Sequence, residues 1–372
     1  KERGDQLFSS SIIALDADSG KYVWHYQVNP RDAWDYGANT QITLTELMIA
    51  STIGLIILAG MSTLFVNNTR AQAEVEKANR QVENGRFAIQ TLASDLRNAG
   101  YYAEFDPTVL ASPAALPNPC ALTVAALKAG LPLPVQGIDQ AAVDALTCLP
   151  GLKPNTDVVV LRRTSTCVAG AADCAPVSDG GPFFQASLCD SMTELGSGDS
   201  ANFYALDIGT ATLNRHRRNC NIATPPLADI RRFLTYIYYI ADNDIGTDGI
   251  PTLKRTEVGT NGTELATSTV SLVNGIENLQ LEYGLDTSAD GVADVFTAAP
   301  ADVAAWRQVV SVKLNLLARN TERTAGHSDT RTYTLGRNAA GGALEVTPGG
   351  AYKRHVFQAL VPLPNAAGRR MP

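Results

Sequence analysis

The pattern of hydrophobic and polar positions is dominated by one apolar stretch, residues 42–66, in which Glu46 is the only charged residue. As a helix these roughly 25 residues would be about 37 Å long, enough to cross a hydrocarbon core of about 30 Å. The stretch therefore predicts a membrane-spanning helix. One alternative is a buried core helix, but such a helix is seldom free of charge over more than about 14 residues. The other is a cleavable signal peptide, but its apolar run should end at a small-residue cleavage site, whereas this run continues into a polar helix.

The helical pattern continues into a polar segment, residues 67–100, which contains no proline. Apolar side chains recur in it at helical spacing and predict one covered face. They are Val75, Ala78, Val82, Ile89, Leu92 and Leu96. Gly100 is suited to end the helix. The sequence thus predicts a single helix of about 55 residues from near Thr43, with a lipid-soluble first half and an amphipathic second half.

Two regions of different composition follow the helix. Residues 101–155 are rich in Ala, Pro and Leu and predict a loop-rich region with a short helix at 138–146. Residues 156–372 predict a β-rich domain with strands at 158–161, 202–206, 232–241, 253–258, 279–284, 309–317 and 356–361. Its densest aromatic group, expected in the sheet core, is Phe233, Tyr236, Ile237, Tyr238 and Tyr239. The expected fold class is α+β.

Ahead of the apolar stretch, residues 1–41 have a pattern of their own. Residues 10–15 are a short apolar run, residues 16–20 are rich in Asp, Ser and Gly, and residues 21–28 alternate aromatic and polar side chains. This order predicts a strand, a turn and a second strand.

Composition narrows the classes of function. The chain has 372 residues and a net charge of −7, so its charge gives no basis for binding nucleic acid. The basic cluster Arg215, His216, Arg217 and Arg218 is interpreted as a solvated surface patch, with an anion or DNA site as the alternative. The four histidines are scattered, and the sequence lacks G-x-S-x-G, H-E-x-x-H and a glycine-rich phosphate loop. We therefore expect a structural protein with neither enzymatic activity nor a cofactor.

All six cysteines follow the apolar stretch, and an even number there predicts disulfides in an oxidising periplasm. Six cysteines allow fifteen connectivities. Pairing neighbours in the sequence closes the shortest loops and joins Cys120 to Cys148, Cys167 to Cys174, and Cys189 to Cys220. Zinc binding is the alternative, although the chain has neither a C-x-x-C pair nor paired histidines.

Two acidic loops are candidate metal sites. Asp286, Ser288, Asp290 and Asp294 place oxygen side chains at alternating positions, and Gly291 permits a tight turn. This pattern is compatible with calcium, although it lacks the glutamate that ends a standard calcium loop, and an ordinary Asp/Gly turn is the alternative. A looser version consists of Asp242, Asn243, Asp244 and Asp248.

The long helix with its two halves, opened by Thr43-Leu44-Thr45-Glu46-Leu47, resembles the N-terminal helix of type IV pilins and pseudopilins. The resemblance implies that Glu46 pairs with the N-terminal amine of a neighbouring subunit during assembly. A carboxylate in an apolar helix also points to function on physical grounds, the alternative being a glutamate that reaches the membrane interface. At the processing site the family has glycine and phenylalanine, where this chain has Gln41 and Ile42.

Later segments resemble PilW-like minor pilins, namely YYIADNDIGTDGIPTLKR, LVNGIENLQLEYGLDTSADG, VVSVKLNLLARN and YKRHVFQALVPLPN. The resemblance implies a long helix packed on an antiparallel sheet domain. It also implies an inner-membrane anchor with a periplasmic domain, then incorporation near the pilus tip to start assembly. Expected partners are other minor pilins, the major pilin, the inner-membrane assembly platform and lipid. A pseudopilin of a type II secretion system is the alternative.

The first 41 residues resemble a repeat of quinoprotein alcohol dehydrogenases, A-x-D-x-x-x-G-K-x-x-W. The matching positions are Ala14, Asp16, Gly20, Lys21 and Trp24. Asp35 corresponds to the catalytic aspartate that lies beside the quinone in that family, but one propeller blade cannot form the cofactor site. A dehydrogenase fragment is therefore the least favoured function. We hypothesise that the chain is a chimera joined near residues 43–47, formed by recombination or by an error in assembling sequence reads.

Overall fold

The computed structural model describes residues 11–27, 40–140, 146–220 and 227–371, with side chains from Leu44 onward in the first helix. The chain divides into two compact units, Lys1–Ala73 and Glu74–Pro372. The first unit contains an antiparallel hairpin of β1 (Ser11–Leu15) and β2 (Tyr22–Gln27), which confirms the predicted strand, turn and strand. Asp16 fixes the turn, because its Oδ1 accepts a hydrogen bond from the backbone amide of Ser19 at 2.8 Å.

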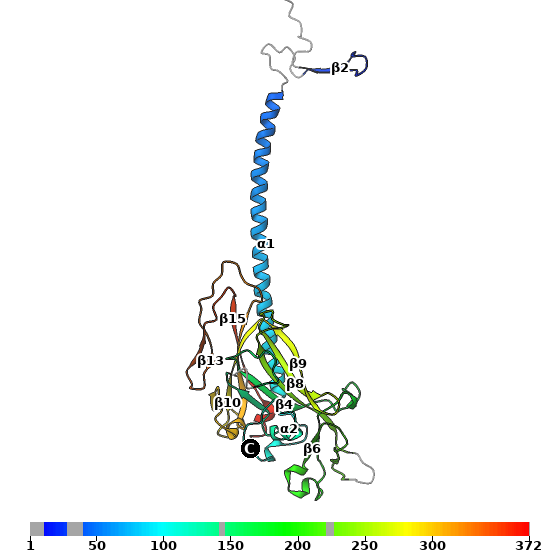
Figure 1. Cartoon of the computed structure of the whole chain (residues 1–372), viewed down its shortest axis with the longest axis vertical. Helices are drawn as coiled ribbons and strands as arrows, with labels where there is room; N and C mark the ends of the chain where they lie inside the picture. Colours follow the sequence, from blue (N-terminus) through cyan, green and yellow to red (C-terminus); the bar gives the residue numbers. More distant parts are fainter. Residues whose placement is uncertain (1–10, 28–39, 141–145, 221–226, 372) are drawn as a thin grey trace, which may run out of the picture. The chain divides into compact units, whose positions relative to one another are not determined.

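Helix α1 (Thr40–Asn98) is unbroken over 59 residues and begins slightly earlier than predicted (Figure 1). It ends as predicted at Gly100, which has a φ of +76° and donates its amide to the carbonyl of Arg162 at 2.9 Å. The helix therefore runs through the apolar stretch and into the second unit with no change of secondary structure.

One face of α1 is covered by the second unit, with its first buried side chain at Gln81. The covered face comprises Gln81, Gly85, Ala88, Leu92, Ala93, Leu96 and Ala99. The predicted face was wrong at its start, because Val75 is 60% exposed. Val75 is 17 residues before Leu92, about 100° round the helix, so it faces away from the buried side chains.

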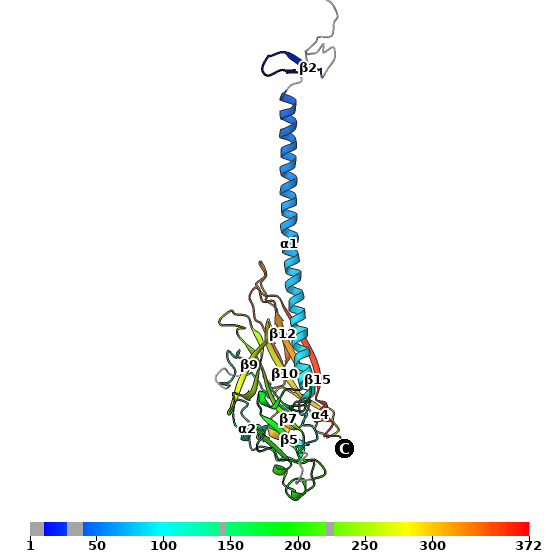
Figure 2. The ribbon, with the colours of Figure 1, turned by 90° about the vertical axis from the view of Figure 1, so that its right-hand side faces the viewer.

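Polar side chains fix the helix where the second unit begins. The Gln81 amide donates to the carbonyls of Ala318 at 2.8 Å and Lys353 at 3.1 Å. The Lys353 ammonium lies 2.7 Å from Glu74 and lowers the pKa of that carboxyl to about 2. These contacts connect α1 to the two sheet strands beside it (Figure 2).

The larger sheet has seven antiparallel strands around β7. They are β3 (Val135–Ile138), β4 (Val158–Thr164), β7 (Ile230–Ala241), β5 (Phe183–Ala186), β6 (Tyr204–Asp207), β8 (Thr252–Thr260) and β9 (Leu265–Asn274). The second sheet has the order β11 (Val295–Thr297), β10 (Ile276–Leu285), β12 (Val309–Arg319) and β15 (Arg354–Pro362). Strands β13 (Tyr333–Arg337) and β14 (Ala343–Val346) form a separate pair. Short helices are α2 (Val124–Gly130), α3 (Val303–Trp306) and α4 (Pro364–Ala367).

The seven predicted strands are all present, and several are longer than predicted. Six others, β3, β5, β9, β11, β13 and β14, were missed, and all but β9 are only 3–5 residues long. The helix predicted at 138–146 was wrong at its first residue, because Ile138 ends strand β3, and residues 141–145 lie outside the described residues. The loop-rich region also contains α2, which was not predicted. Four residues do not carry enough periodicity to distinguish a strand from a loop.

The core lies between α1 and the two sheets. Leu92 and Leu96 are fully buried against side chains of β4, β7, β10 and β12. The aromatic group of β7 is sheet core, as predicted: Phe233, Tyr238 and Tyr239 are buried and fall in three adjoining clusters. The fold is α+β, with the amphipathic half of a long helix packed on antiparallel sheets.

Gly85 marks the closest approach of α1 to strand β15. A Cβ at this position would lie 2.1 Å from Cε2 of the Phe357 ring. Helix propensity alone predicts that Gly85→Ala stabilises the chain by about 1 kcal/mol. Because of the clash we expect the opposite, a loss of about 1–3 kcal/mol.

Thermal unfolding of the detergent-solubilised full chain, followed by circular dichroism, tests this expectation. The exposed Asn79→Ala on the same helix serves as the control and should be neutral or slightly stabilising. A melting temperature for Gly85→Ala above that of the parent would contradict the close approach.

Candidate functional site

The apolar segment of α1, residues 42–66, is the largest exposed hydrophobic surface that the structure describes. From Leu44 onward it is exposed around its whole circumference, unlike the amphipathic half. The exposed large side chains are Leu44, Leu47, Met48, Ile49, Ile53, Leu55, Ile56, Ile57, Leu58, Met61, Leu64, Phe65 and Val66. Among the described residues α1 is the one helix long and apolar enough to cross a membrane. A helix that is hydrophobic on all sides requires lipid or other helices around it.

Hydroxyl groups of Ser51, Thr52 and Thr63 in the apolar segment donate to carbonyls of the same helix. The Ser51 hydroxyl donates to the carbonyl of Met48 at 3.0 Å, and the Thr63 hydroxyl donates to Gly60 at 2.8 Å. Such bonds allow hydroxyls to enter an environment without water. Glu46 is exposed, nearly two turns into the helix, and is the only charged side chain in the segment.

The sites predicted upstream are only partly described. Gln41 and Ile42 lie within the first turn of α1, and their side chains are outside the described structure, so processing there stays a prediction. Asp35 lies outside the described residues altogether.

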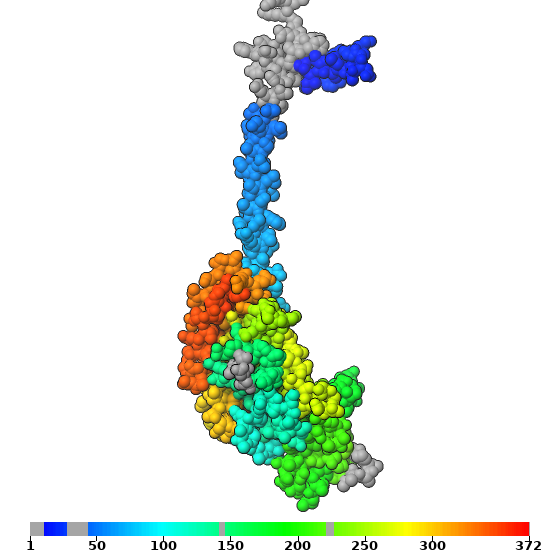
Figure 3. Space-filling model, in the orientation of Figure 1, coloured from blue at the N-terminus to red at the C-terminus, as the bar shows by residue number. Residues whose placement is uncertain are grey.

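The three disulfides have the predicted connectivity. Cys120 is bonded to Cys148, Cys167 to Cys174 and Cys189 to Cys220, with Cα atoms 5.5, 5.8 and 5.0 Å apart. All three lie in the second unit. The first links the segments before and after β3, the second closes a loop after β4, and the third lies in the connection from β5 to β7. The chain segment with the third disulfide is the green lobe at the lower end of the domain in Figure 3.

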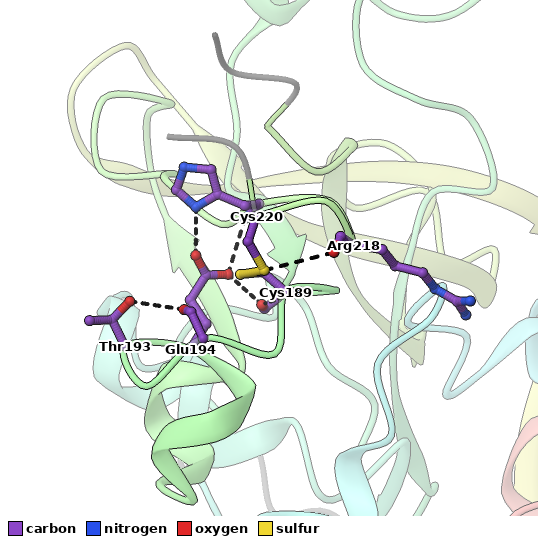
Figure 4. Close-up of a disulfide and its surroundings, with 8 residues drawn as sticks. Cys189, Thr193, Glu194, Arg218 and Cys220 are labelled. Carbon is purple, nitrogen blue, oxygen red and sulfur yellow. Dashed lines mark hydrogen bonds and ion pairs between the residues drawn. A yellow bond between two sulfur atoms is a disulfide. The ribbon is translucent and has the colours of Figure 1, made fainter. Parts of the chain in front are cut away.

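Beside the Cys189–Cys220 disulfide, Glu194 gathers several hydrogen bonds (Figure 4). Its carboxylate accepts from the Ser187 hydroxyl, from the His216 amide at 3.1 Å and from His216 Nδ1 at 2.5 Å. Burial alone would raise the pKa of Glu194, but these hydrogen bonds outweigh burial and the pKa lies below its usual range. Ser187 donates to Glu194 and not to His216, so the trio differs from a Ser-His-carboxylate relay.

The basic cluster was therefore only partly a solvated patch. Arg217 and Arg218 are exposed as predicted, whereas the His216 ring is 18% exposed and is bonded to Glu194. No local pattern predicts this partner, because 22 residues separate His216 from Glu194.

In the acidic loop at 286–294 the carboxylates already accept hydrogen bonds from the loop itself. Asp286 accepts from the amides of Ala289 and Gly291 and from the Arg370 guanidinium at 2.7 Å. Asp294 accepts from the amide and hydroxyl of Thr287. Calcium would have to compete with Arg370 for Asp286. Among the described residues no three or more His, Cys, Asp or Glu side chains gather as metal ligands, and calcium binding stays a prediction.

The looser acidic loop is organised in the same way. Asp248 accepts from the amides of Asp244, Ile245 and Ile250, and Asn243 accepts from Gly249. The Asp248 carboxylate therefore stabilises a turn between β7 and β8.

Asp157, which the sequence analysis did not single out, joins the two sheets. Its side chain accepts from the amide of Gln140, which follows β3, at 2.8 Å and from the amide of Leu281 in β10 at 2.7 Å. Burial raises the pKa of Asp157 to about 7 despite these two bonds. A single buried aspartate carries no sequence signal that separates it from a surface residue.

The contribution of Asp157 to the free energy of unfolding should fall as the pH rises from about 4 to 7. In this window the folded Asp157 retains a proton that an unfolded aspartate, with a pKa near 3.9, has lost. The folded state then binds more protons, and the loss is a few kcal/mol at about 1.4 kcal/mol per pKa unit. Urea unfolding at several pH values measures this slope. Asp157→Asn should flatten it whatever that variant's stability at one pH, and an unchanged slope would contradict the assignment.

Comparisons with known proteins match the chain in two separate parts. Residues 237–365 match the family described as Type IV Pilus-assembly protein W. This segment runs from within β7 to α4 and contains all of the second sheet. Over it the chain is similar to proteins of type IV pilus assembly, which confirms the resemblance found in the sequence. A Type IV-like pilin from Thermus thermophilus also aligns over 78% of this chain and 96% of its own length, with 13% identity and a TM-score of 0.32.

The second part is the N-terminus. Residues 1–71 match the β-propeller domain of glucose, ethanol and alcohol dehydrogenases. A quinohemoprotein alcohol dehydrogenase, ADH-IIG of Pseudomonas putida, is 60% identical over 47 residues, which are 13% of this chain and 6% of that enzyme. The enzyme of Comamonas testosteroni is 47% identical over 55 residues, 15% of this chain and 8% of the enzyme. The chain thus spans less than a tenth of these relatives, and its two ends are similar to different families, as a chimera would be.

Proposed function

We propose that the chain is a minor pilin of a type IV pilus, held in the inner membrane by the apolar segment with its sheet domain in the periplasm. One observation carries the proposal. Helix α1 is exposed and apolar on all sides over its first half and is covered along one face by the domain over its second half. Such a helix can be surrounded by lipid before assembly and by other helices afterwards. The match to type IV pilus-assembly proteins supports this reading.

In this proposal the protein acts by packing and not by catalysis, and it requires no cofactor. The apolar segment joins the helices of other minor pilins and of the major pilin, and the sheet domain contacts neighbours near the tip, where assembly starts. Glu46 pairs with the N-terminal amine of an adjacent subunit, because a carboxylate inside such a bundle requires a cationic partner. The three disulfides suit a domain in an oxidising compartment.

N-terminal mass spectrometry of the protein from native membranes and pili tests whether it can enter a filament. A mature terminus at or near Ile42 supports the proposal, because Glu46 then lies close to a free amine. Peptides that retain Trp24 in all of the pilus-associated protein would oppose it.

Glu46→Gln tests the role of the carboxylate directly. We expect membrane retention to be unchanged and incorporation into pili to fall at least tenfold, since the amide cannot form an ion pair. Glu83→Gln, at an exposed position in the amphipathic half, is the matched control. Equal incorporation of both variants would contradict the assembly role.

Co-purification with secretion components instead of pilus components would favour the pseudopilin alternative.

A further inference from the structure

The second unit contains a cavity of about 530 Å³ at the end of α1, within the range typical of small-ligand sites. Its walls come from five segments that are distant in the sequence. They are the turn after α1, the loop after α2, the acidic loop at Ala289, helix α3 with its following turn, and the C-terminal helix α4 with the residues after it. The prolines Pro107, Pro132 and Pro134 make two of these walls rigid and apolar.

The charge of this cavity is opposite to that of the chain. Its lining contains Arg307, Arg369 and Arg370 and no aspartate or glutamate, although the sequence has 37 acidic against 30 basic residues. Convergent arginines in a concave site favour oxyanions, because the guanidinium presents a planar fork of donors.

Among the three arginines of the cavity, Arg307 is the one that forms no ion pair with a described carboxylate. Its Nη1 donates to the carbonyl of Leu110 at 3.1 Å and to the Ser112 hydroxyl at 2.8 Å, and its Nη2 donates to Thr108 at 2.9 Å. All three acceptors are neutral, and in the described part of the chain no carboxylate forms an ion pair with Arg307. These bonds hold the guanidinium in position and leave its positive charge available.

The two C-terminal arginines are positioned in a similar way. Arg369 donates to the carbonyl of Gly100 at 2.7 Å, and its Nε lies 3.6 Å from Asp106, which is half exposed. Burial lowers the pKa of Arg369, so an added negative charge would stabilise its cationic form. Arg370 is paired through Nε with Asp286, so the acidic loop serves to orient an arginine of the cavity.

We propose that this cavity binds the carboxylate or phosphate groups of an anionic ligand, with Arg307 as the principal contact. The ligand is either a free small oxyanion or the acidic side chains of a bound protein partner, since both present the same oxygens to the guanidinium groups. The site is separate from the apolar segment and does not depend on the proposed assembly role.

Isothermal titration of the full chain in detergent with citrate, with inorganic phosphate and with a blocked tetraglutamate peptide tests the proposal. Saturable 1:1 binding of citrate or phosphate would identify a free oxyanion. Binding of the peptide with neither ion would identify a protein carboxylate. Absence of saturable binding for all three probes would overturn the proposal.

Two variants locate the site. Arg307→Gln should weaken binding about tenfold to a hundredfold, as expected for the loss of a charge-assisted contact, whereas Arg217→Gln, at an exposed arginine, should bind as the parent does. Ala304 is an exposed residue of the cavity wall on α3, so substitution there should preserve the fold even if Arg307→Gln does not. Ala304→Glu should abolish binding by adding a competing carboxylate, and Ala304→Gln is its control of equal size. Equal affinity of Ala304→Glu and Ala304→Gln would place any binding elsewhere and refute the assignment.

Discussion

Replacing Ile57 and Leu58 by arginine should release most of the protein from the membrane fraction. Both side chains lie near the middle of the apolar segment and are more than half exposed, so neither substitution disturbs packing in the sheet domain. Each arginine costs about 2.5–3.5 kcal/mol at the centre of a membrane helix, and the two together cost about 5–7 kcal/mol. A cost of this size shifts the membrane equilibrium by roughly a factor of 10⁴.

Fractionation of cells followed by carbonate extraction measures the release. Val75→Arg is the matched control, because Val75 is 60% exposed on the same helix but lies in its polar half. We expect the control to stay in the membrane as the parent does. If the double variant also remained resistant to extraction, the apolar segment would not be the membrane anchor.

Asp329→Ala should destabilise the sheet domain by about 3–5 kcal/mol. Asp329 is fully buried at its side chain and lies 2.9 Å from Nη1 of Arg354, whose side chain is 2% exposed. Glu277 is the second carboxylate on the same guanidinium. Removing Asp329 leaves the buried cation with incomplete compensation and deprives the Tyr333 hydroxyl of the acceptor it has at 2.9 Å.

The Arg217–Asp229 pair provides a control with almost the same geometry and a different environment. Its nitrogen and oxygen are 2.8 Å apart, but the two side chains are 54% and 40% exposed. Asp229→Ala should therefore cost less than about 1 kcal/mol. Urea unfolding of both variants, followed by circular dichroism, compares them. If the two variants lost similar free energies of unfolding, burial of Asp329 would not be the reason for its contribution to stability.

Sequence predictions were accurate where a feature depends on residues close together in the chain. The 59-residue helix and its end at Gly100 were predictable because helical periodicity and the cap depend on neighbours within a few residues. The disulfide pairs were predictable because each closes the shortest loop available, a local criterion that happened to hold three times. The hairpin at 11–27 was predictable from its Asp/Ser/Gly turn.

Predictions that depended on distant partners were less accurate. Val75 was assigned to the same face as Leu92, yet it is 60% exposed, because 17 residues of helix turn it about 100° away from Leu92. His216 was assigned to a solvated cluster because its partner Glu194 belongs to another segment. The sequence analysis made no prediction for Gly85, and only the position of Phe357 explains a glycine in this helix.

The sequence by itself determined the membrane-compatible helix, the fold class and the similarity of the two ends to different families. Each of these rests on composition, periodicity or motifs that are contiguous in the chain. Only the tertiary structure decided that Asp157 joins two sheets, that Asp329 and Arg354 form a buried pair, and that Arg307, Arg369 and Arg370 line one cavity. The physical reason is that burial, charge compensation and cavity shape arise from contacts between residues far apart in the chain, and a linear pattern does not record such contacts.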